Sequence, residues 1–196
     1  MRIISGRFKG QLLVNFQAKR IRPTTDRIKG SLFNKWMNEI DGARVLDLFA
    51  GTGNLGLEAL SRGAVHCTFV EGHEISVRII RDNIQKLKVA SSEYRIVKQD
   101  VLDFLKRYHG DPFDLILIDP PFTEKMAEEV MKALSRSKAF GPQTLIAIES
   151  GTKEPIADQY RKLVCYDRRD FGDKTLSLFQ ESQQVEDTSG GPIETE

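Results

Sequence analysis

A short motif near the middle of the chain, Asp119-Pro120-Pro121-Phe122, has residue types suited to holding a planar amine. It follows the apolar run 113–118, which predicts an acid and a rigid turn at the end of a buried strand. The Asp119 carboxylate and the Pro120 carbonyl can accept hydrogen bonds from an exocyclic NH2 group, and Phe122 can stack on the base that carries it. These three residues are candidate catalytic residues for base modification. The motif is equally compatible with a plain strand-to-loop stop, because proline ends a strand ladder.

A glycine turn in the first third of the chain indicates a cofactor site. It follows the apolar run 44–48, and Glu71 ends the next apolar run. Gly51 and Gly53 allow a ligand to approach the backbone closely, and Glu71 can accept hydrogen bonds from two ribose hydroxyls. This pattern suits any adenosine-bearing ligand, and an NAD-dependent oxidoreductase is one class that matches it.

Two further acids bear on the choice of cofactor. Asp47 precedes the glycines by four residues, where it would repel a pyrophosphate but would suit a cationic amino acid. Asp100 follows a third predicted strand and can accept a hydrogen bond from an adenine amino group. Together with Glu71, these acids favour S-adenosylmethionine over NAD. Each acid also has a structural interpretation, as a helix cap or a loop acid.

Charge is unevenly distributed along the chain. The net charge is +1, but residues 1–40 carry nine Lys or Arg against two acids, a net of +7. Such a basic end is a candidate RNA or DNA surface, although a run of charges can also be an ordinary solvated face. The candidate phosphate contacts are Arg2, Arg7, Lys9, Lys19, Arg20, Arg22 and Arg27.

The pattern of apolar residues predicts one α/β domain. Residues 1–22 read as a basic hairpin and 23–41 as a helical segment, followed by a core over 42–180. In that core, strands and helices alternate, which requires a mostly parallel sheet with helices on both faces and an antiparallel hairpin at the end. The predicted strands are 44–48, 65–70, 94–98, 113–118, 143–149, 160–168 and 174–180, and the predicted helices are 54–62, 74–88, 101–108 and 124–136.

The remaining composition excludes several classes. No apolar run is long enough to span a bilayer, so we expect a cytoplasmic protein with no membrane partner. Cys67 and Cys165 lie in apolar runs, as expected of reduced core thiols, and no histidine has Cys or His partners at metal-ligand spacing. The acidic segment 181–196 has too few apolar residues to fold and is predicted to be a disordered tail.

With both motifs in view, residues 1 to about 180 resemble the ribosomal RNA small subunit methyltransferase D family, which methylates the exocyclic N2 of a guanine in 16S ribosomal RNA. The segment Arg22-Pro23-Thr24-Thr25-Asp26-Arg27 is the most specific part of the likeness. The chain departs from the family where Gly30 replaces a glutamate and His73 an acid. Other shared segments are Arg2-Ile3-Ile4-Ser5-Gly6, Asp47-Leu48-Phe49-Ala50-Gly51-Thr52-Gly53 and Asp119-Pro120-Pro121-Phe122.

The resemblance implies a Rossmann-like class I methyltransferase fold with seven strands and S-adenosylmethionine as cofactor. It implies that Gly51 and Gly53 approach the methionine part and that Glu71 binds the ribose. The other implied cofactor contacts are Asp100, Val101 and Thr25. The implied reaction is direct transfer to a flipped-out guanine held by Asp119.

The resemblance also implies a partner, 16S ribosomal RNA within a small subunit or an assembly intermediate, and we expect a monomer. Besides the NAD-dependent oxidoreductase, two alternatives remain open from the sequence. A DNA or RNA adenine amino methyltransferase would share the Asp119 motif and differ in base choice. A non-catalytic RNA-binding protein of ribosome assembly would keep the basic end and would lose nothing if Asp119 were changed.

Overall fold

The computed structural model describes residues 1–15, 23–121, 126–154 and 156–182, and only the backbone of residues 23–25. Several predictions fall outside these residues, namely those for Lys19, Arg20, Arg22, Phe122, the side chain of Thr25 and the tail from residue 183.

The described chain alternates helices and strands, as predicted. The helices are α1 (Pro23–Lys35), α2 (Asn54–Ser61), α3 (Glu74–Leu87), α4 (Val101–Arg107), α5 (Met126–Leu134) and the short η1 (Ser91–Glu93). The strands are β1 (Arg44–Leu48), β2 (His66–Glu71), β3 (Tyr94–Lys98), β4 (Leu115–Ile118), β5 (Leu145–Gly151), β6 (Gln159–Tyr160), β7 (Leu163–Phe171) and β8 (Lys174–Glu181). Most bounds agree with the predicted ranges within two residues, while α1 ends at Lys35 and turns continue toward residue 40.

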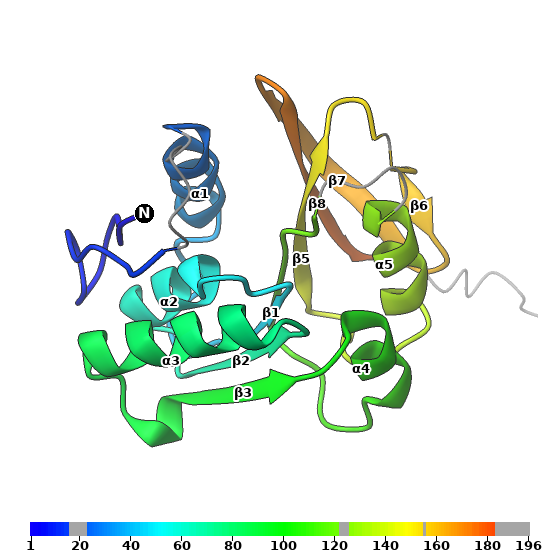
Figure 1. Cartoon of the computed structure of the whole chain (residues 1–196). Helices are drawn as coiled ribbons and strands as arrows, with labels where there is room; N and C mark the ends of the chain where they lie inside the picture. Colours follow the sequence, from blue (N-terminus) through cyan, green and yellow to red (C-terminus); the bar gives the residue numbers. More distant parts are fainter. Residues whose placement is uncertain (16–22, 122–125, 155, 183–196) are drawn as a thin grey trace, which may run out of the picture.

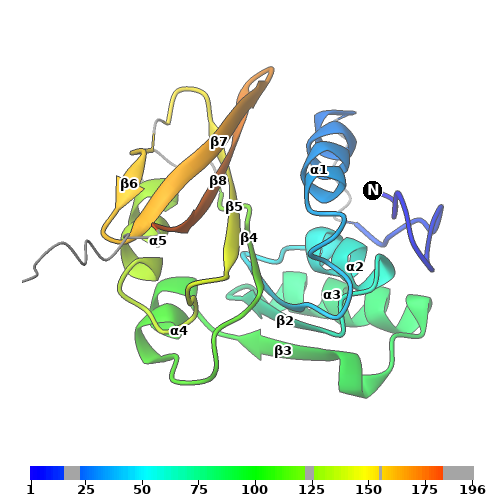
Figure 2. The same cartoon turned by 180° about the vertical axis from the view of Figure 1, so that it is seen from behind.

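The strands form one sheet in the order β3-β2-β1-β4-β5-β8-β7-β6. The strands from β3 to β5 are parallel, whereas β8 pairs with β5 and β7 in antiparallel orientation. The predicted parallel sheet with an antiparallel edge hairpin is therefore confirmed. The seven predicted strands are all present, and the two-residue strand β6 adds an eighth beside β7 (Figures 1 and 2).

Helices cover both faces of the sheet, and each face has its own hydrophobic core. In both views α1, α2 and α3 lie at one side of the molecule, and α4 and α5 lie at the other (Figures 1 and 2). Alternate residues of a strand point to opposite faces. On β1, Val45 accordingly packs with α1–α3, while its neighbour Leu46 packs with α4 and α5. This double burial is why β4 reads as a continuous apolar run and why both neighbours Val45 and Leu46 of β1 are apolar. No described helix has the length and apolar character needed to cross a membrane.

Residues 1–15, called here the N-terminal arm, fold back on themselves and lie on α2. The predicted hairpin is present as a short antiparallel pairing. Arg2 and Leu12 form a bridge, and backbone N–H groups of Ile3, Gly10 and Leu13 donate across the arm to Gln11, Ile3 and Met1. The pairing does not grow into longer strands, because the N–H groups of Ile4 and Ser5 bind the Glu58 carboxylate, at 2.8 and 3.0 Å.

Candidate active site

The candidate site lies at the carboxyl ends of β1, β2 and β4. The chain proceeds outward from β1 in both directions across the sheet, through β2 to β3 and through β4 to β5, which makes this a topological switch point. Ligands of open parallel sheets bind in the crevice at such a point. Three predicted groups follow these strands: the loop 49–53, Glu71 and Asp119. The structure therefore brings the glycine turn, the acid predicted to bind a ribose and the motif predicted to hold an amine to one edge of the sheet.

The loop between β1 and α2 has a backbone that leaves space for a ligand. Phe49, Gly51 and Gly53 have φ angles of 58°, 56° and 77°, in the left-handed region that favours glycine. A methyl group added at Gly51 would meet only the Phe49 carbonyl oxygen, at 3.8 Å. The loop then passes directly into α2 at Asn54. A ligand can thus approach this backbone without displacing a side chain of the described chain.

Glu71 is held in place by backbone donors on two sides. Its Oε2 accepts from the Gly51 N–H at 2.8 Å, and its Oε1 accepts from the His73 N–H at 2.8 Å. A carboxylate has about four lone-pair sites, so these two bonds leave acceptor capacity for two further donors. This arrangement fits the hydroxyl pair of a ribose. His73 contributes its backbone N–H to this arrangement, so these two hydrogen bonds do not depend on its side chain.

Asp47 lies beneath the loop and is only 2% exposed. Its Oδ2 accepts from the Gly56 N–H at 2.9 Å. Burial raises the pKa of Asp47 to about 7, the Gly56 hydrogen bond opposes this rise, and the charges of Asp119 and Glu71 add to it. Asp47 therefore fastens the first turn of α2 under the loop. With Glu71 and Asp119 it gives the site an acceptor-rich, acidic character, which fits the cationic S-adenosylmethionine and disfavours a pyrophosphate.

Gly56 is the residue that allows this close packing, and a matched pair of variants tests it. A methyl group at Gly56 would lie 2.4 Å from Phe69 Cε1 and 2.5 Å from Cys67 Sγ, whereas one at Gly30 in α1 would meet nothing within 4 Å. We expect Gly56→Ala to lower the free energy of unfolding by roughly 1–3 kcal/mol. Gly30→Ala should raise it by roughly 0.5–1 kcal/mol, because alanine is the better helix former. Urea denaturation measures both, and equal stability of the two variants would contradict the packing argument.

Asp100 and Val101 lie where β3 passes into α4. Asp100 is the N-cap of α4, and its Oδ1 accepts from the Asp103 N–H at 3.1 Å. Its structural interpretation as a helix cap is thus confirmed, and the residue is exposed. Val101 is buried. The contacts of both residues with an adenine ring stay a prediction.

Asp119 follows β4 directly, and its side chain is 37% exposed. Lys174 Nζ lies 3.9 Å from Asp119 Oδ1 and 2.7 Å from Glu149 Oε2. Burial raises the pKa of Asp119, and the charge of Lys174 opposes this rise. Pro120 is buried beside it. The strand end therefore presents a partly accessible carboxylate backed by a buried ion pair.

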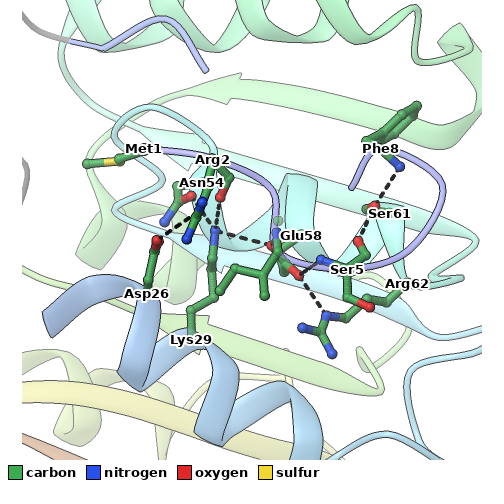
Figure 3. A network of polar contacts seen from close by, with 12 residues as sticks. Met1, Arg2, Ser5, Phe8, Asp26, Lys29, Asn54, Glu58, Ser61 and Arg62 are labelled. Atoms are coloured by element: carbon green, nitrogen blue, oxygen red, sulfur yellow. Dashed lines mark hydrogen bonds and ion pairs between the residues drawn. The ribbon is translucent and has the colours of Figure 1, made fainter. Parts of the chain in front are cut away.

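A second buried cluster fixes the N-terminal arm to α1 and α2 (Figure 3). Lys29 of α1 and Glu58 of α2 are both 0% exposed, and Lys29 Nζ lies 3.1 Å from Glu58 Oε2. The same ammonium donates to Arg2 O at 2.6 Å and to Asn54 Oδ1 at 2.7 Å, which uses all three of its donors. Glu58 also accepts from Arg62 Nε at 2.7 Å. This cluster ties the arm, α1 and α2 into one unit.

The arm is also connected to the cofactor loop. The buried Asn83 of α3 accepts from the Val14 N–H at 2.6 Å and donates to Val14 O at 3.0 Å and to Thr52 O at 2.9 Å. At the other end of the arm, Thr52 Oγ1 donates to Met1 Sδ at 3.5 Å. A single side chain on α3 therefore contacts both the arm and the loop that would hold the cofactor.

The structure places the described phosphate-contact candidates on the arm and the start of α1. Arg2 forms an ion pair with Asp26 at 3.3 Å, and Arg7 forms one with Glu93. Surface pairs of this kind contribute little to stability, so both guanidinium groups can exchange partners at low cost. The other two described candidates, Lys9 and Arg27, are exposed.

Sequence reasoning missed five buried charged residues: Lys29, Glu58, Glu149, Glu154 and Lys174. A signal existed for Lys29, because it precedes Phe33 by four residues and Trp36 by seven and so falls on the apolar stripe of its helix. For Lys174, the strand pattern alone gave no indication of a buried partner. A metal site is a separate question. None was predicted from the sequence, and the described residues contain no group of His, Cys, Asp or Glu that could hold a metal ion.

The sheet order, the glycine loop after β1 and the acid that ends β2 define a class I methyltransferase, the class that uses S-adenosylmethionine. The family model described as "Conserved hypothetical protein 95" matches residues 1–180, so the chain belongs to this family. The chain is 38% identical over 157 residues to ribosomal RNA small subunit methyltransferase D of Haemophilus influenzae, covering 80% of this chain and 81% of the relative. It is 33% identical over 187 residues to the protein of the same name from Escherichia coli, covering 95% and 92%.

Two solved structures are similar to this chain in both fold and sequence. One from Escherichia coli has a TM-score of 0.82 at 32% identity and covers 94% of this chain and 99% of its own. One from Haemophilus influenzae has a TM-score of 0.79 at 33% identity and covers 92% and 97%. The predicted resemblance to the ribosomal RNA small subunit methyltransferase D family is confirmed, and the protein is a methyltransferase.

Proposed function

We propose that the protein methylates the exocyclic N2 amine of a guanine in 16S ribosomal RNA, with S-adenosylmethionine as methyl donor. The observation that carries the proposal is the position of Asp119. It follows β4 at the same sheet edge as the glycine loop and Glu71, so an amine held by Asp119 would lie beside the cofactor. The names of the Haemophilus influenzae and Escherichia coli relatives support small-subunit ribosomal RNA as the substrate.

The residues of the crevice would bind the cofactor in three parts. Gly51 leaves backbone space for the methionine part, and the left-handed backbone of Gly53 turns the loop into α2. Glu71 has free acceptor capacity for the ribose. Asp100 and Val101, at the end of the neighbouring strand, would border the adenine. When bound, S-adenosylmethionine supplies the methyl group, and its sulfur keeps the electron pair of the broken S–C bond.

The chain's own part in the chemistry is to orient and charge-stabilise the amine. The nitrogen lone pair of a guanine amine is delocalised into the ring, so positioning has to do most of the work. The Asp119 carboxylate and the Pro120 carbonyl would accept the two amine hydrogens and leave the lone pair facing the methyl group. As the N–C bond forms, the nitrogen becomes positive and Asp119 stabilises that charge. One proton then leaves the nitrogen for Asp119 and passes to water.

The basic arm would bind the RNA backbone around the target. A stacked guanine cannot reach Asp119, so the base has to be unpaired or flipped out of its helix. Lys9, Arg27, Arg2 and Arg7 would contact phosphates, which set affinity and its salt dependence rather than the choice of base. We further propose that a monomer acts in the cytoplasm on a small subunit or an assembly intermediate.

The direct test is methyl transfer from labelled S-adenosylmethionine. Undermethylated small subunits and protein-free 16S RNA are offered to the wild type, and the products are digested to nucleosides. Label in N2-methylguanosine is the expected result, and faster labelling of subunits would support an assembled particle as substrate. Label in methyladenosine would contradict the choice of base, and no label in any RNA would contradict the proposed substrate.

A further inference from the structure

A buried lysine stands directly behind the amine-binding acid. Lys174, the first residue of β8, is 5% exposed, although lysine is rarely buried unless it is paired. Its ammonium lies 2.7 Å from Glu149 Oε2 and 3.9 Å from Asp119 Oδ1. It is therefore in hydrogen-bond contact with one carboxylate and within ion-pair distance of the other.

Sheet register explains why these three side chains meet. Ile118 on β4 lies opposite Ile148 on β5, so Asp119 and Glu149 come next on the same face of the sheet. On β8, Lys174 lies opposite Gly151, two residues beyond Glu149 on β5. Lys174 thus shares the face of Glu149, and its long side chain reaches along β5 to the end of β4. The arrangement depends on β5 and β8 lying side by side, as they do in Figure 1.

The site contains more negative than positive charge. On the described strands the carboxylates that face this crevice are Asp47 on β1, Glu71 on β2, Asp119 after β4 and Glu149 on β5, and Lys174 on β8 is the cation among them. Burial and the charge of Asp119 raise the pKa of Glu149, with Lys174 opposing. Burial raises the pKa of Asp119 in the same way. Without a nearby cation, burial and like charges would favour a protonated Asp119.

We propose that Lys174, anchored by Glu149, is a positioning residue that keeps Asp119 ionised for methyl transfer. A protonated Asp119 would lose much of its acceptor strength toward the amine hydrogens and could not stabilise the positive nitrogen. Lys174 acts through Asp119 and makes no contact with substrate in this assignment. The inference rests on the proposed function, and it adds a residue to it that the Asp119 motif does not include.

Two single variants should move the pH dependence in opposite directions. Activity requires the carboxylate, so it falls as pH drops through the pKa of Asp119. Lys174→Met removes the opposite charge, and the midpoint of this acidic limb should rise by about one pH unit or more. Glu149→Gln removes a like charge, and the midpoint should fall. At high pH, where Asp119 is ionised in every variant, the single-turnover rate of Lys174→Met should recover to within a few-fold of wild type.

The controls separate this effect from simple damage to the fold. Lys132→Met breaks an exposed pair with Glu128 on α5 and should leave the pH profile unchanged. Glu149→Gln is nearly isosteric and keeps an acceptor for Lys174, so it tests the proposal even if Lys174→Met does not fold. A Lys174→Met variant that is slower by the same factor at every pH, or two midpoints that shift in the same direction, would overturn the proposal.

A readout without RNA distinguishes failure of this inference from failure of the proposed function. The carboxyl signal of Asp119 is followed by NMR in protein made with isotope-labelled aspartate and assigned by its absence in Asp119→Asn. Its midpoint should shift upward in Lys174→Met and downward in Glu149→Gln, whatever RNA the enzyme uses. An unchanged midpoint in both variants would refute the role of Lys174, even if the wild type methylates guanine.

Discussion

Replacement of Asp119 by alanine is expected to lower the single-turnover rate of methyl transfer by roughly 100- to 1,000-fold, the scale measured when one group that stabilises transition-state charge is removed. The variant loses the acceptor for the amine hydrogens and the charge that stabilises the positive nitrogen. Affinity for S-adenosylmethionine should change little, because Glu71 and the glycine loop keep their mutual hydrogen bond. Rapid-quench assays with labelled cofactor and a cofactor titration measure the two quantities.

The matched control for this result is Asp119→Asn. Asparagine keeps the size and one acceptor oxygen of aspartate but has no charge. Its rate should therefore lie between those of Asp119→Ala and the wild type. An alanine variant that keeps a tenth or more of the wild-type rate would show that Asp119 is part of a strand-to-loop stop and not of the reaction. A large loss of cofactor affinity in Asp119→Ala would mean that this acid belongs to the cofactor site.

The largest effect on stability is expected at Glu58. Glu58→Leu leaves the ammonium of Lys29 buried without its counter-charge and deprives Arg62 and the amides of Ile4 and Ser5 of their acceptor. Removal of one partner of a buried ion pair costs about 3–5 kcal/mol, which is a large part of the stability of an ordinary domain. Urea denaturation with the linear extrapolation should show this loss.

Charge, rather than lost packing, should account for most of that cost. Adding Lys29→Met to Glu58→Leu removes the uncompensated charge, so the double variant should be more stable than Glu58→Leu alone. If the double variant loses as much stability as Glu58→Leu and Lys29→Met lose together, a charge effect would be contradicted. Burial already lowers the pKa of Lys29 in the wild type, and the opposing effect of Glu58 is absent from the variant. The folded variant then binds this proton less tightly than the unfolded chain, so its stability deficit should shrink as pH rises toward the usual lysine pKa.

Much of the fold could be predicted from the sequence, because strands that are buried on both faces of the sheet are rich in apolar residues. The run 113–118 is apolar at five of its six positions and 44–48 at three of five, and the helices between strands carry regular apolar stripes, so element order was predictable. Strand ends could be placed to within three residues. Parallel strands present their carboxyl ends at one edge, so the meeting of Gly51, Glu71 and Asp119 could also be anticipated.

The partners of the buried charges could not be predicted, for a physical reason. Lys29 and Lys174 each pair with a carboxylate that is distant in the sequence, and no local pattern identifies such a partner. The Lys174 contact depends on the register between β5 and β8, which no local pattern in either strand determines. The short extent of the arm's antiparallel pairing has a similar cause. The N–H groups of Ile4 and Ser5 bind Glu58, and a hairpin pattern cannot show a competing acceptor on a helix.

The side chain of Asn83 limits how freely the N-terminal arm could be exchanged between family members. One amide group satisfies both backbone groups of Val14 and the carbonyl of Thr52, and it is fully buried while doing so. An aspartate lacks the donors, and a leucine lacks both functions. The arm therefore cannot be treated as an interchangeable attachment to a catalytic core. A chimera that received the arm of another family member would also need a compatible α3. The reason is that the α3 side chain that binds the arm also binds the loop 49–53, which would hold the cofactor.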